Sequence, residues 1–280
     1  MRWLRLRGVP VPHRQRKTLR ALRRRKLRHR PGHGHCAPRA GVAHPDDGRR
    51  EVSWHIASVS WGKDSLAMLH LLIDRGMPLD EVVFYDTGAE FRAIYAERDA
   101  TLPLLRERGI AYTELRPRDP FFYNMLVRPV RSRATGEVHA YGYGWCGGVC
   151  RWGTSEKTAA IDKHAKAMGA TVQYVGIASD ETARLAKKRY DHIAHPLADW
   201  GMTEADCLAA CYERGHEWSE GGMRLYDVLD RVSCWCCRNK NQRELKAIHD
   251  HLPDYWQRLL ALESRLGQMK RKPLEAIGGE

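Results

Sequence analysis

The stretch Ser-Val-Ser-Trp-Gly-Lys-Asp-Ser at residues 58–65 joins a predicted strand to a predicted helix. A short apolar run at 54–59 precedes it and predicts a buried strand, and a leucine-rich run after it predicts a helix over 65–75. The first amides of a helix that starts in such a turn have no partner within the helix, so they can bind an anion. Other groups of the turn would help these amides to bind the anion. Gly62 gives a flexible backbone, and Lys63 adds a point charge. Ser60 and Ser65 add two hydroxyl donors.

Two further features of this stretch narrow its function. Asp64 can cap the helix or help to hold a hydrated Mg²⁺ ion. The Walker A pattern, in which a glycine and four residues precede Gly-Lys-Ser/Thr, is absent, and this excludes a P-loop nucleotide hydrolase. An ordinary capped turn between a strand and a helix is the alternative to an anion site.

The rest of the chain alternates strands with helices. Strands separated by helices of ten to fifteen residues predict an α/β fold, a parallel sheet doubly wound by helices. In such sheets a ligand binds at the carboxyl ends of the strands. The predicted strands cover 54–59, 81–85, 111–115 and 171–177, and the predicted helices cover 65–75, 93–108 and 154–168.

Four motifs in a fixed order carry a family resemblance. Residues 60–65 resemble the Ser-Gly-Gly-x-Asp-Ser loop of the PP-loop ATP pyrophosphatases, with Trp61 in place of the first glycine. Residues 82–91, 175–184 and 195–206 resemble motifs of the phosphoadenosine phosphosulfate (PAPS) reductase branch of that superfamily. The resemblance implies an adenine nucleotide alpha-hydrolase-like fold that binds ATP, or PAPS, with Mg²⁺.

The resemblance also implies roles for individual residues. The residues expected to act on the phosphates are Lys63, Asp64 and Arg184. Those expected to bind the nucleotide are Ser60, Gly62, Ser65, Asp86, Thr87, Gly88, Glu90, Gly176 and Glu181.

The charge of the chain is concentrated at its beginning. The net charge is +13, but residues 1–50 hold sixteen basic and two acidic residues, and residues 51–280 hold 31 basic and 32 acidic ones. We therefore expect a basic, disordered segment over 1–50, a nucleotide-binding domain over 51–201, and a helical region over 202–280. The basic segment is either an arm that binds nucleic acid or a non-native extension.

The long stretch 117–144 and the absence of long apolar runs give two more expectations. The stretch 117–144 is rich in Arg, Pro and aromatic residues and predicts a lid or substrate surface, in which Arg128, Arg131 and Arg133 could meet an anionic substrate. A solvated basic loop is the alternative. No apolar run approaches the ~18 residues that span a bilayer, so we expect a cytoplasmic protein without a membrane partner.

Two cysteine clusters predict a metal site or a reactive thiol. Eight cysteines in an intracellular enzyme favour metal binding or catalysis over disulfides. Four thiolates from two loops would suit a [4Fe–4S] cluster or zinc, and free buried thiols are the third possibility. The expected ligands are Cys146, Cys150, Cys234 and Cys237, with Cys236 as a spare thiol. Cys207 and Cys211 lie four residues apart on a predicted helix and are expected in the core.

The cysteines also bear on the reaction. In PAPS reductases a thiolate from a C-terminal Glu-Cys-Gly segment attacks the sulfate sulfur, and a thioredoxin-like reductant then releases sulfite. Residues 238–280 contain no cysteine. The preferred interpretation is therefore ATP α-phosphate chemistry, with adenylylation and pyrophosphate release, coupled to transfer from a sulfur donor, as in tRNA thiolases and the DNA phosphorothioation enzyme. Sulfonucleotide reduction is the second interpretation, and a non-enzymatic nucleotide-binding regulator of a mobile element is the third.

Overall fold

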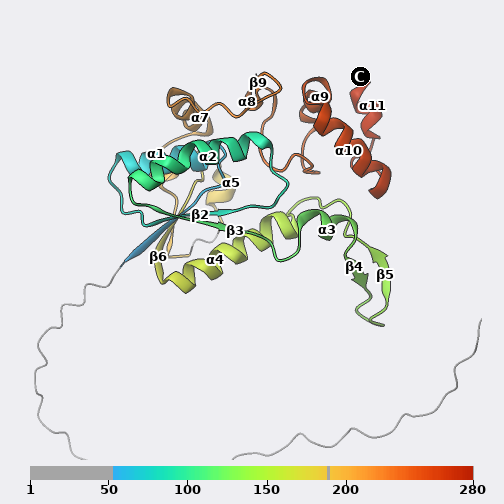
Figure 1. Ribbon diagram of the computed structural model, residues 1–280, viewed down its shortest axis with the longest axis horizontal. Helices are drawn as coiled ribbons and strands as arrows, with labels where there is room; N and C mark the ends of the chain where they lie inside the picture. The colour runs from blue at the N-terminus through green and yellow to red at the C-terminus, as the bar shows by residue number, and fades with distance from the viewer. Residues whose placement is uncertain (1–52, 188–189, 280) are drawn as a thin grey trace, which may run out of the picture. The chain divides into compact units, whose positions relative to one another are not determined.

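A five-stranded parallel sheet forms the centre of the protein. The computed structural model describes residues 53–187 and 190–279 (Figure 1). The strands lie in the order β3-β2-β1-β6-β7, and every neighbouring pair is parallel. The bounds are β1 (Trp54–Ser58), β2 (Glu81–Tyr85), β3 (Ala111–Leu115), β6 (Ala170–Val175) and β7 (Ile193–Ala194). The α/β fold predicted from the sequence is confirmed.

Helices cover both faces of this sheet (Figure 1). Successive side chains of a strand point to opposite faces. On β2, Val83 and Tyr85 pack with Ile161 and Ala165 of α4, whereas Phe84 belongs to the larger core cluster with α1 and α2. The helices that follow the strands are α1 (Lys63–Asp74), α2 (Arg92–Glu107), α4 (Glu156–Met168), α5 (Thr182–Leu185), α6 (Pro196–Asp199) and α7 (Glu204–Glu213).

The second half of the chain adds smaller elements. Capping boxes begin two of its helices, because Thr203 and Asp206 at α7, and Asn241 and Glu244 at α9, exchange side-chain and backbone hydrogen bonds. The last helices are α8 (Leu225–Val228), α9 (Gln242–His251), α10 (Pro253–Leu266) and α11 (Leu274–Gly278). The other elements are α3 (Phe121–Leu126), a π-helical turn η1 (Arg151–Ser155), and the strands β4 (Pro129–Arg131), β5 (Val138–Tyr141), β8 (Ser219–Glu220) and β9 (Met223–Arg224).

Several boundaries differ from the sequence prediction. The helix expected at 65–75 begins at Lys63, and the one expected from 154 follows a π-helical turn. The region 202–280, expected to be helical, also contains the β8–β9 hairpin, and the helix α8 that follows this hairpin is a single turn. The stretch 117–144, expected as a loop, contains α3 and the β4–β5 hairpin. Cys207 and Cys211 are fully buried, as expected.

The predicted division of the chain is not settled by the fold. The basic segment over 1–50 lies outside the described residues, and the boundary at 201 stays a prediction. Within the described ranges, no helix combines the length and the apolar character that crossing a bilayer would require.

Candidate functional site

The loop between β1 and α1 is held by its two serines. The Ser65 hydroxyl accepts the backbone N–H of Ser60 at 3.1 Å and donates to the Gly62 carbonyl at 3.0 Å. Gly176, at the end of β6, lies against this loop: a Cβ there would meet the Ser65 Cα at 3.0 Å and the Asp64 carbonyl at 3.1 Å. Only glycine therefore allows β6 to approach the helix start this closely.

Trp61 occupies the loop position where the family has a glycine, and its backbone is left-handed. Its φ is 62°, a conformation that disfavours residues with a Cβ. The side chain is fully buried and packs against Phe84 and Tyr112, and the carbonyl accepts the indole N–H of Trp218 at 2.7 Å. The loop thus keeps the glycine-like backbone, and core packing offsets the cost of the side chain.

Lys63, expected from the resemblance to act on the phosphates, is buried at the helix start. It is 7% exposed, and its Nζ lies 2.6 Å from Asp64 Oδ1 and 2.7 Å from Glu204 Oε2. Burial lowers the pKa of Lys63, but the two carboxylates outweigh burial and leave it raised. The backbone N–H of Lys63 donates to the Tyr226 hydroxyl at 3.0 Å, so this first-turn amide already has a partner. In this arrangement Lys63 joins α1 to α7.

A cavity of about 440 Å³ opens at the carboxyl ends of β1 and β6. This is where a parallel sheet binds ligands, and the volume falls in the range of small-molecule sites. The predicted nucleotide residues that line this nucleotide cavity are Ser60, Ser65, Gly176 and Arg184. Arg184 is half exposed and donates to both oxygens of Glu181, at 2.6 and 2.8 Å. Glu181 therefore positions the guanidinium at the rim.

Three residues of the family motif at 82–91 lie away from this cavity. Asp86, Thr87 and Gly88 line neither this cavity nor the one described next. The Asp86 carboxylate accepts the Gly88 N–H at 2.8 Å, and the Thr87 hydroxyl donates to Glu90 at 3.0 Å. Glu90 in turn accepts the thiol of Cys234 at 3.7 Å, and burial raises the pKa of Glu90. The motif thus forms a turn that holds the second cysteine cluster instead of lying against the nucleotide cavity.

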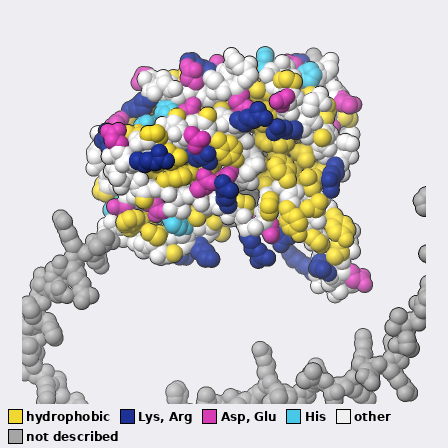
Figure 2. Space-filling view, viewed as in Figure 1, with side chains coloured by type: hydrophobic (Ala, Val, Ile, Leu, Met, Phe, Trp, Pro, Cys, Tyr) yellow, Lys and Arg dark blue, Asp and Glu magenta, His cyan; other side chains and the backbone are white. Residues whose placement is uncertain are grey.

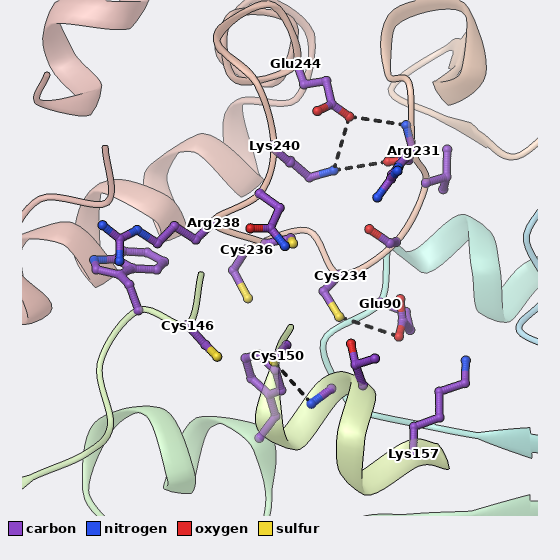
Figure 3. Close-up of a pocket in the computed structure, with 18 of the residues that line it drawn as sticks. Glu90, Cys146, Cys150, Lys157, Arg231, Cys234, Cys236, Arg238, Lys240 and Glu244 are labelled. Carbon is purple, nitrogen blue, oxygen red and sulfur yellow. Dashed lines mark hydrogen bonds and ion pairs between the residues drawn. The ribbon is translucent and has the colours of Figure 1, made fainter. Parts of the chain in front are cut away.

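A second cavity, of about 630 Å³, brings the two cysteine clusters together. Its walls include five thiols, from Cys146, Cys150, Cys234, Cys236 and Cys237. Figure 3 shows the side chains of Cys146, Cys150 and Cys236 turned toward one space, with Cys234 directed to Glu90. We call this space the cysteine cavity.

Paired hydrogen bonds connect the loops that carry these cysteines. The Gly148 N–H donates to the Asn239 side-chain oxygen at 3.0 Å, and the Asn239 amide donates back to the Gly148 carbonyl at 2.8 Å. The sulfur of Cys150 accepts the Gly153 N–H at 3.2 Å and so caps η1. Segments far apart in the sequence are therefore joined at the cavity wall.

The fit of a metal or cluster can be judged from the donor set. Five thiols around one cavity match the ligands of an iron–sulfur cluster or zinc in type. Among the described residues, however, no three His, Cys, Asp or Glu side chains lie close enough together to bind one metal ion. The predicted set of Cys146, Cys150, Cys234 and Cys237 shares a cavity without forming a preorganised site.

The two cavities adjoin. Both are lined by Ser60, Gly153, Thr154 and Lys157, so the thiols lie on the far side of the wall from the nucleotide loop. Burial lowers the pKa of Lys157, and the neighbouring Glu90 and Cys234 oppose this effect. The sequence analysis missed Lys157; its only signal was its place in the first turn of the helix after the first cysteine cluster.

Comparisons with known proteins agree with the loop and the sheet. Residues 55–118, from β1 through β3, match the model of the phosphoadenosine phosphosulfate reductase domain, and this confirms the predicted family resemblance. No curated protein sequence matches the chain. Among solved structures, the U34-tRNA thiolase NcsA from Methanococcus maripaludis, with its [4Fe–4S] cluster, is similar at 14% identity and a TM-score of 0.43, over 81% of this chain and 80% of that one. A similarity this weak says nothing about the activity of this chain.

Proposed function

We propose that this protein binds ATP and activates an acceptor by chemistry at the α-phosphate, and that it couples this activation to sulfur transfer. The observation that carries the proposal is the wall shared by the nucleotide cavity and the cysteine cavity. An adenylylated acceptor formed in the first cavity would stand next to thiols in the second. The adenylylated acceptor would therefore not have to cross the molecule between the two steps.

The residues divide this work between binding and transfer. The hydroxyl of Ser60 and the guanidinium of Arg184 would hold the phosphates, and Ser65, whose hydroxyl donates to Gly62, would position the loop. Lys157 would add a positive charge from the shared wall. The acceptor oxygen would attack the α-phosphorus and pyrophosphate would leave. A sulfur nucleophile would then displace AMP from the acceptor. Mg²⁺ bound with the phosphates would supply charge neutralisation.

The cysteine cavity is the proposed site of the sulfur step. The thiols of Cys146, Cys150 and Cys236 face one space and would carry the sulfur themselves, since no three of the described side chains lie close enough together to bind a metal ion (Figure 3). Sulfane sulfur transferred from a donor persulfide, with release of the donor thiol, would stay bound as a cysteine persulfide until it reaches the acceptor. Glu90 and Thr87 hold the Cys234 thiol at the other side of the cavity, each at 3.7 Å.

Two substrates offered separately test this proposal. Purified protein is incubated with ATP or with PAPS, together with a cell RNA and small-molecule extract as acceptor, and pyrophosphate, AMP and sulfite are measured. Pyrophosphate and AMP from ATP support activation at the α-phosphate. Sulfite from PAPS would assign sulfonucleotide reduction instead, and nucleotide binding without any product would assign a regulator.

A further inference from the structure

The β4–β5 hairpin carries positive charge that the rest of the body lacks. Residues 116–151 contain six arginines and two acidic residues, whereas residues 51–280 as a whole have one more acidic than basic residue. Arg131, Arg133 and Arg151 are exposed, and no described carboxylate lies within ion-pairing distance of any of them. Positive side chains that the fold itself does not pair are available to an anionic partner.

Exposed aromatic side chains lie among these arginines. Tyr141 is 69% exposed and Tyr143 is 37% exposed. The guanidinium groups of Arg128 and Arg151 lie 5.8 and 5.5 Å from the centre of the Tyr143 ring. Figure 2 shows hydrophobic side chains gathered over the corner that bears the hairpin, with Lys and Arg side chains along its lower edge. Arg128 is paired with Asp119 at 2.7 Å, whereas Arg151 has no described carboxylate partner. An aromatic ring next to such a guanidinium group suits a partner with both bases and phosphates.

The base of the hairpin is rigidly attached to α3. Gly142 and Tyr143 donate backbone hydrogen bonds to Arg128 and Asn124, at 2.8 and 2.9 Å. A Cβ on Gly142, whose φ is +73°, would lie 2.4 Å from the Met125 carbonyl, so the returning strand packs directly on the helix end. The backbone that carries the charged and aromatic side chains is therefore fixed at the base of the hairpin before any partner binds.

The hairpin also leads straight to the cysteine cavity. Phe121 and Met125 of α3, before the hairpin, and Trp145 and Cys146, after it, line that cavity. A chain bound along the hairpin would reach the cavity without crossing another part of the protein.

We propose that Arg131, Arg133, Arg151, Tyr141 and Tyr143, the basic hairpin surface, bind single-stranded nucleic acid and direct one of its nucleotides to the cysteine cavity. This inference rests on the proposed function for the step that follows binding, and it names a polynucleotide as the acceptor. Phosphates meet the arginines, and bases stack on the tyrosines. Because stacking on an aromatic ring tolerates any base, this surface would select nucleic acid as the class of acceptor. The cysteine cavity would select the nucleotide that reacts.

The test uses the full chain and two labelled 12-nucleotide strands of one sequence, an RNA and a DNA, followed by fluorescence anisotropy at several salt concentrations. Tyr141→Ala should weaken binding about tenfold, the loss expected from one stacked base. Arg131→Gln combined with Arg133→Gln should reduce the salt slope by about 1.4, because each phosphate contact on a single strand contributes about 0.7. The matched control, Arg106→Gln with Arg108→Gln, removes the same charge from exposed positions at the end of α2 and should leave the affinity unchanged.

Photocrosslinking locates the bound strand independently of its affinity. Strands that carry a thiolated pyrimidine are irradiated with the protein, and the attached peptides are identified by mass spectrometry. Crosslinks in 131–151 that Tyr141→Ala abolishes support the proposal, and the strand that gives them, RNA or DNA, identifies the acceptor. Crosslinks only outside 131–151 would overturn it. A second result would also overturn the proposal. If a hairpin variant no longer self-associates in light scattering but binds both strands with full affinity, the hairpin is a protein interface. ATP binding, measured separately by calorimetry, tests the nucleotide site and not the hairpin.

Discussion

Replacing Trp61 by alanine and, separately, by glycine tests why a tryptophan stands in the nucleotide loop. The indole is fully buried, and a buried Trp→Ala change costs about 3–5 kcal/mol. The indole N–H is buried without a hydrogen-bond partner among the described residues, so its removal returns about 1 kcal/mol. We therefore expect Trp61→Ala to lower the free energy of unfolding by about 3 kcal/mol.

The order of the two variants depends on the backbone. At a φ of 62° alanine is strained by about 1–2 kcal/mol relative to glycine. The greater freedom of glycine in the unfolded chain costs it about 0.4–1 kcal/mol. Trp61→Gly should therefore be the more stable variant, by about 0.5–1 kcal/mol. Trp256, buried in the right-handed helix α10, provides the control, because there the alanine variant should be more stable by about 1 kcal/mol.

Urea unfolding followed by circular dichroism measures both pairs. We expect the glycine variant to be the more stable one at position 61 and the alanine variant to be the more stable one at position 256. If Trp61→Ala is as stable as Trp61→Gly, or more stable, position 61 is not left-handed and the proposed reason for the family glycine is refuted.

Three further changes test the ion pairs of Lys63, the contact between two histidines and the connection between the cysteine loops. Lys63→Ala leaves Glu204 and Asp64 without their shared cation and should lower the free energy of unfolding by about 2 kcal/mol. This is less than the cost of breaking a fully buried ion pair, because Glu204 is half exposed. An unchanged urea midpoint would show that these ion pairs contribute nothing. His70, which contacts His216 at 2.8 Å, has its pKa lowered to about 4 by burial and by that neighbour. The neutral form of His70 therefore stabilises the fold above pH 6.5, and up to about 3 kcal/mol of unfolding free energy is lost as the pH falls from 6.5 to 4. His70→Asn should flatten this pH dependence of stability in urea titrations. An unaltered pH dependence would show that His70 is not its source. Asn239→Ala removes the paired hydrogen bonds between the cysteine loops and should speed thiol modification by Ellman's reagent, whereas equal rates would mean that the loops are held by other contacts.

The sequence predicts the sheet and the loop well because their signals are local. Apolar runs separated by helices predict parallel strands, and the serines and the single glycine at 58–65 mark the turn. The left-handed conformation of Trp61 follows from the family pattern, since a glycine position indicates that φ. The burial of its side chain depends on Phe84 and Tyr112, which no local pattern connects to it.

The sites were predicted less completely, because they depend on contacts between distant segments. Lys63 was expected to offer its charge to the phosphates, but Glu204 from α7 pairs with it, and a pairing over 141 residues leaves no mark in the motif. The residues Asp86–Gly88 carry a family motif, yet the turn they form leads to Cys234. The approach of the two cysteine clusters was an expectation from chemistry, and the bond between Asn239 and Gly148 supplies its physical cause.

Cysteine alkylation with and without ATP tests whether the nucleotide cavity and the cysteine cavity work together. The protein is treated with iodoacetamide at a saturating ATP concentration fixed by calorimetry, and the labelling of each cysteine is followed by mass spectrometry. Cys207, whose pKa burial raises to about 12, serves as the unreactive reference. We expect ATP to slow the labelling of Cys146 and Cys150 severalfold. Unchanged labelling of both cysteines with ATP bound would contradict it.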